Sequence, residues 1–213
     1  MTAANVTAVA IPMDAAAHAG ELTVPAGARG IVLFAHGSGS SRLSPRNVFV
    51  AECLQRERIA TLLFDLLTEA EDRRYETRFD IELLTRRLLA ATDWLEHDPA
   101  NKHLGLGYFG ASTGAAAAPR AAAVRANVRA VVSRGGRPDL ALNELPRVRA
   151  ATLLIVGGHD EVVIEMNRTA YAQLTAPKAL EIVPGATHLF EEPGALEQVA
   201  QLAAEWFGRY LAT

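Results

Sequence analysis

Short apolar runs alternate with amphipathic segments along the chain from about residue 30 to its end. Each run has the length, the β-branched or aromatic content and the flanking turn residues of a buried strand. The runs are residues 30–35, 60–65, 104–109, 128–133, 151–156 and 179–183. Because strands that alternate with helices form parallel sheets covered by helices, the pattern predicts a mostly parallel sheet of the α/β class.

Three segments between or after these runs have the pattern of helices. Residues 79–96 carry apolar side chains at helical spacing, with charged side chains at the other positions, as a sheet-covering helix requires. The segment that follows Pro193-Gly194 repeats this spacing. Its apolar positions are Leu196, Val199, Ala203, Phe207 and Tyr210. Residues 115–123 are rich in alanine and predict a tightly packed helix, in which Pro119 removes a hydrogen bond, so we expect a kink or break there.

The first thirty residues have a different pattern. Residues 6–11 and 21–24 have the composition of two short strands, and Ala19-Gly20 between them suggests a turn. We therefore expect an antiparallel pair at the edge of the sheet.

Composition bounds the class of protein. The chain has 213 residues, of which 50% are hydrophobic and 21% charged, so residues 1–213 can form one globular domain with a sizeable core. A net charge of −3 gives no electrostatic reason to expect nucleic acid or an anionic membrane as a partner. Cys53 is the single cysteine, which excludes an intramolecular disulfide. The first twenty residues have no signal-peptide pattern, so we expect a soluble cytoplasmic protein and leave a homo-oligomeric state open.

Ser112 lies in the segment with the strongest chemical signal. Gly110-Ala111-Ser112-Thr113-Gly114 follows an apolar run and precedes the alanine-rich segment, which predicts a sharp turn from strand to helix. Such a turn lifts a serine hydroxyl clear of the sheet, toward a base that can activate it. The flanking glycines allow the strained backbone that the turn needs. We interpret Ser112 as a nucleophile.

His188 and Asp160 are the candidate base and acid. Each follows a later predicted strand, and the ends of parallel strands meet at one edge of the sheet. The chain order serine, aspartate, histidine is the one expected after a nucleophile turn of this kind. Glu161, next in the chain, and Asp139, after the strand at 128–133, remain alternative acids.

The turn His36-Gly37-Ser38-Gly39-Ser40-Ser41 follows the strand at 30–35. Acyl transfer builds negative charge on an oxygen, which backbone N–H groups in such a turn can stabilise. We predict that Thr113 supplies one N–H of this oxyanion hole and Ser38 the other, with Gly39 as the alternative to Ser38. His36 is interpreted as structural.

Taken in chain order, these segments resemble the α/β-hydrolase superfamily, and more closely the small serine hydrolases related to dienelactone hydrolase. The matching segments are His36 to Ser41, Ser44 to Asn47, Leu63 to Thr68, Gly110 to Gly114, Ser133 to Asp139, Gly157 to Asp160 and Ala186 to Gly194. The resemblance implies a mostly parallel sheet of about eight strands and hydrolysis of a small-molecule ester, thioester or lactone without metal or organic cofactor. It also implies that Ser112, His188 and Asp160 form a catalytic triad. True dienelactone hydrolases use cysteine as the nucleophile, whereas this chain has Ser112.

Three other classes of function compete with an enzyme of this kind. The segment Gly105 to Gly110 spells a dinucleotide-binding pattern, but its glycines lie inside a predicted strand, which argues against that function. The histidines lack the spacing of metal ligands. A ligand-binding or regulatory module that keeps the fold without catalysis is the remaining alternative.

The segment 134–149, where many such enzymes insert a cap domain, is short in this chain. An open cleft with little apolar cover predicts small substrates instead of long-chain lipids. Four arginines near the predicted site are candidates to contact an acidic substrate group, with ordinary solvated surface charge as the alternative interpretation. They are Arg42, Arg46, Arg134 and Arg137.

Overall fold

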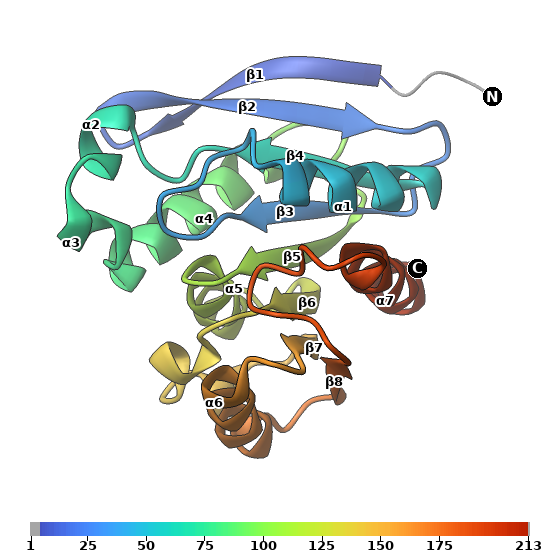
Figure 1. Cartoon of the computed structure of the whole chain (residues 1–213). Helices are drawn as coiled ribbons and strands as arrows, with labels where there is room; N and C mark the ends of the chain where they lie inside the picture. Colours follow the sequence, from blue (N-terminus) through green and yellow to red (C-terminus); the bar gives the residue numbers. More distant parts are fainter. Residues whose placement is uncertain (1–4, 213) are drawn as a thin grey trace.

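The structure is a computed structural model and describes residues 5–212. Eight strands form one sheet in the order β1-β2-β4-β3-β5-β6-β7-β8 (Figure 1). The strands are β1 (Asn5–Met13), β2 (Ala16–Val24), β3 (Gly30–Ala35), β4 (Ile59–Phe64), β5 (Gly105–Ala111), β6 (Val128–Arg134), β7 (Ala151–Gly157) and β8 (Lys178–Val183). The pairs β1–β2 and β2–β4 are antiparallel and all other pairs are parallel. The predicted α/β class is thus confirmed.

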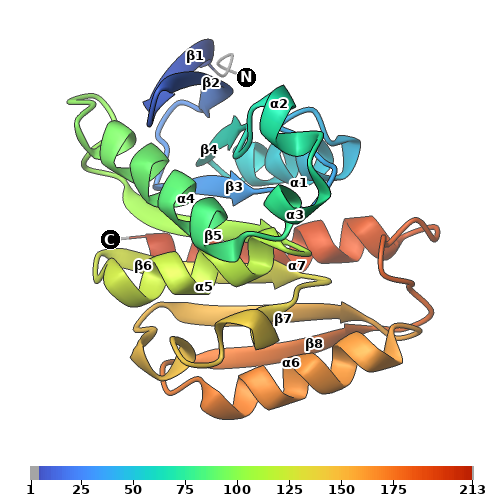
Figure 2. The same ribbon diagram turned by 90° about the vertical axis from the view of Figure 1, so that its left-hand side faces the viewer.

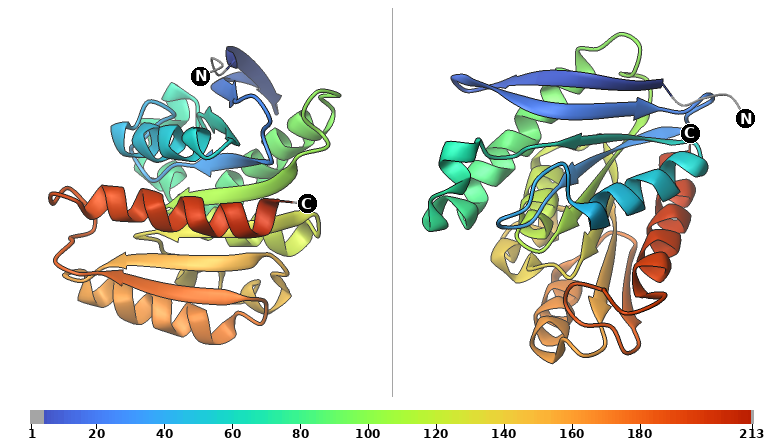
Figure 3. Two further views of the ribbon diagram at one scale, coloured as in Figure 1. Left: turned by 90° about the vertical axis from the view of Figure 1, so that its right-hand side faces the viewer. Right: turned by 45° about the horizontal axis from the view of Figure 1, so that its top comes forward.

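Helices cover both faces of this sheet. The longer helices are α1 (Pro45–Arg56), α4 (Ile81–Glu96), α5 (Gly114–Val124), α6 (Glu161–Gln173) and α7 (Ala195–Leu211), and the short ones are α2 (Glu69–Asp72) and α3 (Tyr75–Arg78). Helices α4, α5 and α6 pack on one face (Figure 2), and α1 and α7 pack on the other (Figure 3, left). Within residues 5–212, none of the helices has both the length and the apolar character that a membrane crossing demands.

The alternation of side chains along β3 explains why both faces need cover. Ile31 and Leu33 point into the core beneath α4 and α5, while Val32 and Phe34 point into the core beneath α1 and α7. All four are at most 1% exposed. A central strand that is apolar on both sides must be covered on both sides, which is why its sequence is a continuous apolar run.

The N-terminal hairpin is antiparallel as expected, but its predicted turn is wrong. The strands turn at Asp14 and Ala15, where Asp14 adopts a left-handed φ of 50°. Gly20 lies inside β2, opposite Val9, and a Cβ at that position would be 3.0 Å from the Val9 side chain. Gly20 therefore allows close packing within the sheet and does not mark the turn that the sequence predicted.

Helix α5 also differs from its prediction. It runs from Gly114 through Pro119 to Val124, so the expected break does not occur. Ala115, one turn before the proline, and most of the other residues around it are small and fully buried. Their packing holds the helix together despite the one missing backbone hydrogen bond.

Candidate active site

Parallel pairing brings the carboxyl ends of β3 to β8 to one edge of the sheet. The loops that follow β3, β5, β6, β7 and β8 therefore meet there. Between β6 and β7 the chain forms only two short 3-10 turns, Pro138–Ala141 and Leu145–Arg147, so this edge carries no large cap. The sequence placed the candidate residues on these same loops.

Ser112 occupies a strained turn between β5 and α5. Its φ is 50°, a left-handed value that is rare for a residue with a side chain. The turn leaves no room for side chains on either flank, because a Cβ on Gly110 would lie 2.5 Å from the Ala115 Cα and a Cβ on Gly114 would lie 2.1 Å from the Ala35 carbonyl oxygen. Two flanking glycines and a serine under strain are the geometry that exposes a nucleophile.

The neighbouring strand holds this turn in place. The Ser112 N–H donates to the Arg134 carbonyl at 3.2 Å, and the Arg137 N–H donates to the Ser112 carbonyl at 3.2 Å. These bonds to the end of β6 and the loop after it support the strained backbone on both sides. Local strain persists only when the surrounding structure supports it in this way.

His188 is oriented by Asp160. The His188 Nδ1 lies 2.7 Å from the Asp160 Oδ2, which is the distance of a charge-assisted hydrogen bond. Asp160 is the residue immediately before α6, yet its side chain makes no capping bond to that helix. Its carboxylate is therefore directed to the histidine and not to the helix.

The loops that carry these two residues are tied together at their base. The Gly158 N–H donates to the Val183 carbonyl at 2.8 Å, and the His159 N–H donates to the Ala186 carbonyl at 2.9 Å. A Cβ on Gly157 would lie 2.5 Å from the carbonyl oxygens of Ala186 and Thr187, so the two loops touch through their backbones. This close approach of the two loops fixes the distance between Asp160 and His188.

The alternative acids do not contact His188. Asp139 forms a two-bond ion pair with Arg137, with both N···O distances at 2.9 Å. Glu161 begins α6 and is exposed. Of the three carboxylates that the sequence offered, Asp160 alone is hydrogen-bonded to the histidine.

Ser112 and His188 face a shared cavity of about 240 Å³. Its lining residues are Gly37, Ser38, Ser40, Ser44, Arg46, Ala111, Ser112, Arg134, His188 and Leu189. Among the described residues no hydrogen bond joins the Ser112 hydroxyl to the His188 ring. Such contacts are often long in unliganded sites and shorten when substrate binds. Larger hollows of about 690, 700 and 500 Å³ lie elsewhere on the surface, but Ser112 lines none of them.

The glycine-rich loop after β3 lies against Ser112. A Cβ on Gly37 would be 3.0 Å from the Ser112 Cβ. Ser38 lines the cavity, whereas Gly39 turns toward the Arg78 guanidinium, 3.5 Å from where its Cβ would be. Across residues 5–212, the N–H groups of Ser38 and Thr113 donate to no protein acceptor. Both groups are thus free to bind an oxygen.

His36 holds this loop from below. Its Nε2 accepts a hydrogen bond from the Leu66 N–H, and its Nδ1 contacts the Gly37 carbonyl, both at 3.0 Å. One nitrogen must accept and the other must donate, so the ring is neutral. Burial lowers the pKa of His36 because it disfavours the charged form. These contacts agree with the structural role expected of His36.

The structure separates the four candidate arginines. Arg42 pairs with Asp65 at 2.5 Å, Arg137 pairs with Asp139, and Arg46 pairs with Glu191 at 3.0 Å. Arg134 is only 8% exposed and, within the described chain, has no carboxylate partner. Nothing in the sequence distinguished it from the other three.

The sheet order, the strained serine turn and the histidine–aspartate pair together define an α/β-hydrolase fold. A family model described as "Dienelactone hydrolase family" matches residues 47–211, and the chain belongs to this family. The crystal structure of a dienelactone hydrolase from Anabaena variabilis is similar over 98% of this chain and 99% of that one, with 59% identity and a TM-score of 0.95. Est1E from Butyrivibrio proteoclasticus shares the fold, with 17% identity, a TM-score of 0.82 and coverage of 94% and 97%.

Two curated relatives from Mycobacterium tuberculosis strains are 61% identical over 204 residues, which is 95% of this chain. Both are named, provisionally, as phosphoribosyl transferases. The match covers 45% of their length, so this chain spans about half of each of these proteins.

Proposed function

We propose that this hydrolase cleaves carboxylic esters through an acyl-enzyme intermediate on Ser112, with thioesters and lactones as further candidate substrates. The observation that carries the proposal is the 2.7 Å bond between His188 and Asp160 beside the cavity that Ser112 also lines. Each of the three side chains is suited to one role. Asp160 orients the imidazole, His188 moves protons, and Ser112 forms the covalent bond.

The proposed reaction has two halves. The Ser112 Oγ attacks the substrate carbonyl carbon while the His188 Nε2 takes the hydroxyl proton. The bond to the leaving oxygen then breaks, and His188 gives that proton to the departing alcohol. In the second half His188 takes a proton from water, the hydroxide attacks the acyl carbon, and the Ser112 oxygen leaves with the proton restored.

Negative charge develops on the carbonyl oxygen in both halves. We assign its stabilisation to the N–H groups of Thr113 and Ser38, since Ser38 lines the cavity and Gly39 is not among its lining residues. Each such donor contributes roughly 2.7–4 kcal/mol to transition-state stabilisation in related chemistry. The close contact of Gly37 with Ser112 supports this placement of the loop.

We assign ester hydrolysis, and not phosphoribosyl transfer, to this chain. The relatives with that name are more than twice as long as the region they share with it, and the shared region carries the serine, histidine and aspartate. Retention of all three also favours an enzyme over a binding module, since a binding module needs none of them.

A panel of aryl and alkyl esters, thioesters and lactones of graded acyl length tests the proposal. Purified protein should turn over short esters, and Ser112→Ala should lose roughly 10⁶-fold in kcat, the loss seen when a triad nucleophile is removed. Equal turnover by the variant, or no turnover of any member by the folded protein, would refute it.

A further inference from the structure

Arg134 carries a buried charge without a protein partner. It is 8% exposed, its Nη1 is buried without a hydrogen bond, and no ion pair of the described residues includes it. Arg87 is buried to a similar degree, at 4% exposed, but pairs with Glu71 at 2.8 Å and Asp14 at 3.2 Å. Isolated buried charges are costly and are almost always paired. Because Arg134 has no such partner among the described residues, we look for an anion from outside the chain that would pair with it.

The position of Arg134 points to the substrate as that partner. It is the last residue of β6, directly opposite Ala111 on β5, one residue before the nucleophile. Its carbonyl accepts the hydrogen bond from the Ser112 N–H, and Arg134 is one of the residues that line the cavity with Ser112 and His188. A group bound to this guanidinium lies in the same small space as the reacting carbonyl.

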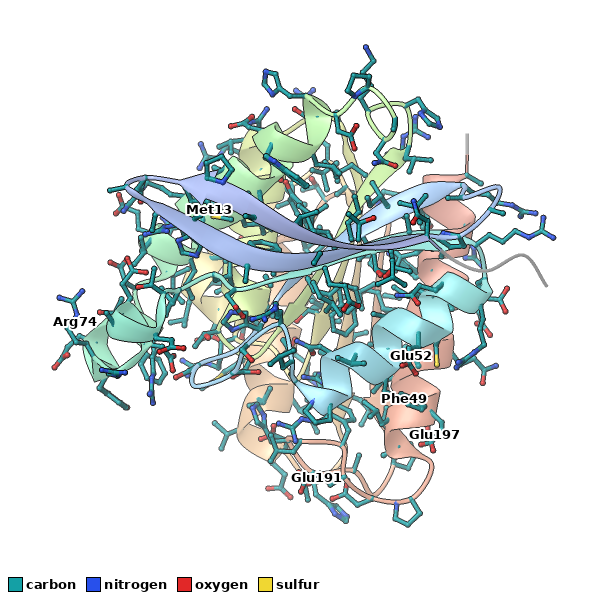
Figure 4. The ribbon with its side chains drawn as sticks, turned by 90° about the horizontal axis from the view of Figure 1, so that it is seen from above. Met13, Phe49, Glu52, Arg74, Glu191 and Glu197 are labelled. Carbon is teal, nitrogen blue, oxygen red and sulfur yellow. The ribbon has the colours of Figure 1, made fainter. Side chains whose placement is uncertain are left out.

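A second positive group faces the same cavity. Arg46, in the first turn of α1, lines it, and its Nε is buried without a partner. Its Nη1 pairs with Glu191, which is largely exposed on the loop before α7 (Figure 4). Burial, and then repulsion from Arg46, lower the pKa of Arg134 to about 10, so the group remains charged at neutral pH. The twelve-residue helix α1 adds the positive end of its dipole at Ser44, another lining residue.

We propose that Arg134, assisted by Arg46, binds an anionic group of the substrate and selects esters that carry a carboxylate or a phosphate near the scissile bond. This inference rests on the proposed function of Ser112. The cavity of about 240 Å³ accommodates a short acyl or alcohol group with such an anion but not a long chain. A guanidinium fork matches both carboxylate and phosphate oxygens.

Equilibrium binding tests the subsite without catalysis. Isothermal titration of the intact protein with glutarate, and separately with inorganic phosphate, should detect one saturable site for at least one of them. Arg134→Met should weaken that binding at least tenfold. Arg168→Met is the matched control, because it removes the same charge at an exposed position on α6, where Arg168 pairs with Glu165. Equal affinity in Arg134→Met, or no binding of either anion to the wild type, would overturn the proposal.

Pairs of esters that differ in one charged group test whether the site prefers an anionic substrate. Monomethyl glutarate and methyl valerate differ by a carboxylate in place of a methyl group. The acetyl ester of 2-phosphoethanol differs from propyl acetate by a phosphate in place of a methyl group. The wild type should prefer the charged member of at least one pair by tenfold or more in kcat/KM. Arg134→Met should remove this preference and Arg134→Lys should restore part of it, whereas Arg168→Met, outside the cavity, should keep both the preference and the rate on the neutral ester.

The outcomes separate the two proposals. Hydrolysis of neutral and charged esters at equal rates overturns the subsite and leaves Ser112 as nucleophile. Anion binding that depends on Arg134, with no hydrolysis of any ester, supports the subsite and refutes the proposed reaction. If Arg134→Met does not fold, Arg46→Met replaces it, and anion affinity unaffected by that change counts against the subsite.

Discussion

Removing the charge of Arg134 should stabilise the protein. The guanidinium is buried, pairs with no carboxylate of residues 5–212, and is repelled by the like charge of Arg46. Its pKa falls to about 10 for these reasons, which corresponds to ~3 kcal/mol against the charged form, since one pKa unit equals about 1.4 kcal/mol. Methionine keeps an apolar stem of similar length and carries no charge. Replacing a buried charged group with an apolar one of similar volume is often stabilising, and we expect a gain of about 1–3 kcal/mol for Arg134→Met.

Thermal and urea unfolding in Tris buffer without phosphate or carboxylates measure this gain. For a chain of this size 1 kcal/mol shifts Tm by about 2–4 °C, so Arg134→Met should melt roughly 2–12 °C above the wild type. Its urea midpoint should rise with the slope unchanged. Added glutarate or phosphate should raise the Tm of the wild type by mass action and leave that of the variant unchanged.

Arg87→Met supplies the comparison. Arg87 is equally buried but holds Glu71, Asp14 and the ring of His18, so its removal leaves a partly buried carboxylate without its partner. That change should cost about 3–5 kcal/mol. If Arg134→Met is destabilised to a similar extent, the Arg134 charge is satisfied within the folded chain. The reasoning that assigns it an anion would then be refuted.

Three further predictions concern the acid, the glycine-rich loop and the thiol. Asp160→Asn should lower kcat by roughly 10⁴, because asparagine cannot hold the histidine in the tautomer that accepts the serine proton. The kcat of Asp139→Asn should stay within tenfold of the wild type. Steady-state kinetics with an aryl ester measure both variants. The pKa of His36 is lowered by burial, so the unfolded chain takes up a proton near pH 6.5 that the folded chain does not. Its contribution to stability is therefore complete above about pH 6.5 and is lost as the pH falls below it, a slope that His36→Gln should reduce in urea unfolding at pH 5 to 8; an unchanged slope would contradict this assignment. Burial raises the pKa of the Cys53 thiol, so Cys53 should react slowly with iodoacetamide at pH 8 and Cys53→Ser should retain full activity; rapid alkylation that inactivates the enzyme would contradict both expectations.

Features of the fold that depend on local pattern were predictable from sequence. The apolar runs located β3 to β8 to within two residues. For β3 to β7 the reason is that strands buried on both faces are continuously apolar, whereas β8 is a half-exposed edge strand. The hairpin turn was missed because Asp14 and Ala15 carry no glycine signal, while Gly20 has a packing role that resembles one. Pro119 was expected to break a helix, yet the tertiary packing of small residues outweighs the lost bond.

Part of the candidate site was also predictable from sequence, and part was not. Ser112, Asp160 and His188 could be proposed because each follows a strand whose end the topology brings to one edge. The sequence could not decide between Asp160 and Asp139. In the structure Asp139 is hydrogen-bonded to Arg137, whereas Asp160 is hydrogen-bonded to His188. Arg134 could not be separated from its neighbours, because whether a charge has a partner depends on residues distant in the chain.

Covalent labelling of the folded protein tests the central claim, that Ser112 is a nucleophile activated by His188, most directly. Intact-mass and peptide mass spectrometry after treatment with a fluorophosphonate should show one adduct per chain, on Ser112. His188→Ala and Asp160→Asn should label far more slowly, and Ser112→Ala should not label at all. A wild type that hydrolyses esters yet carries no adduct, or an adduct that persists on Ser112→Ala, would contradict the account.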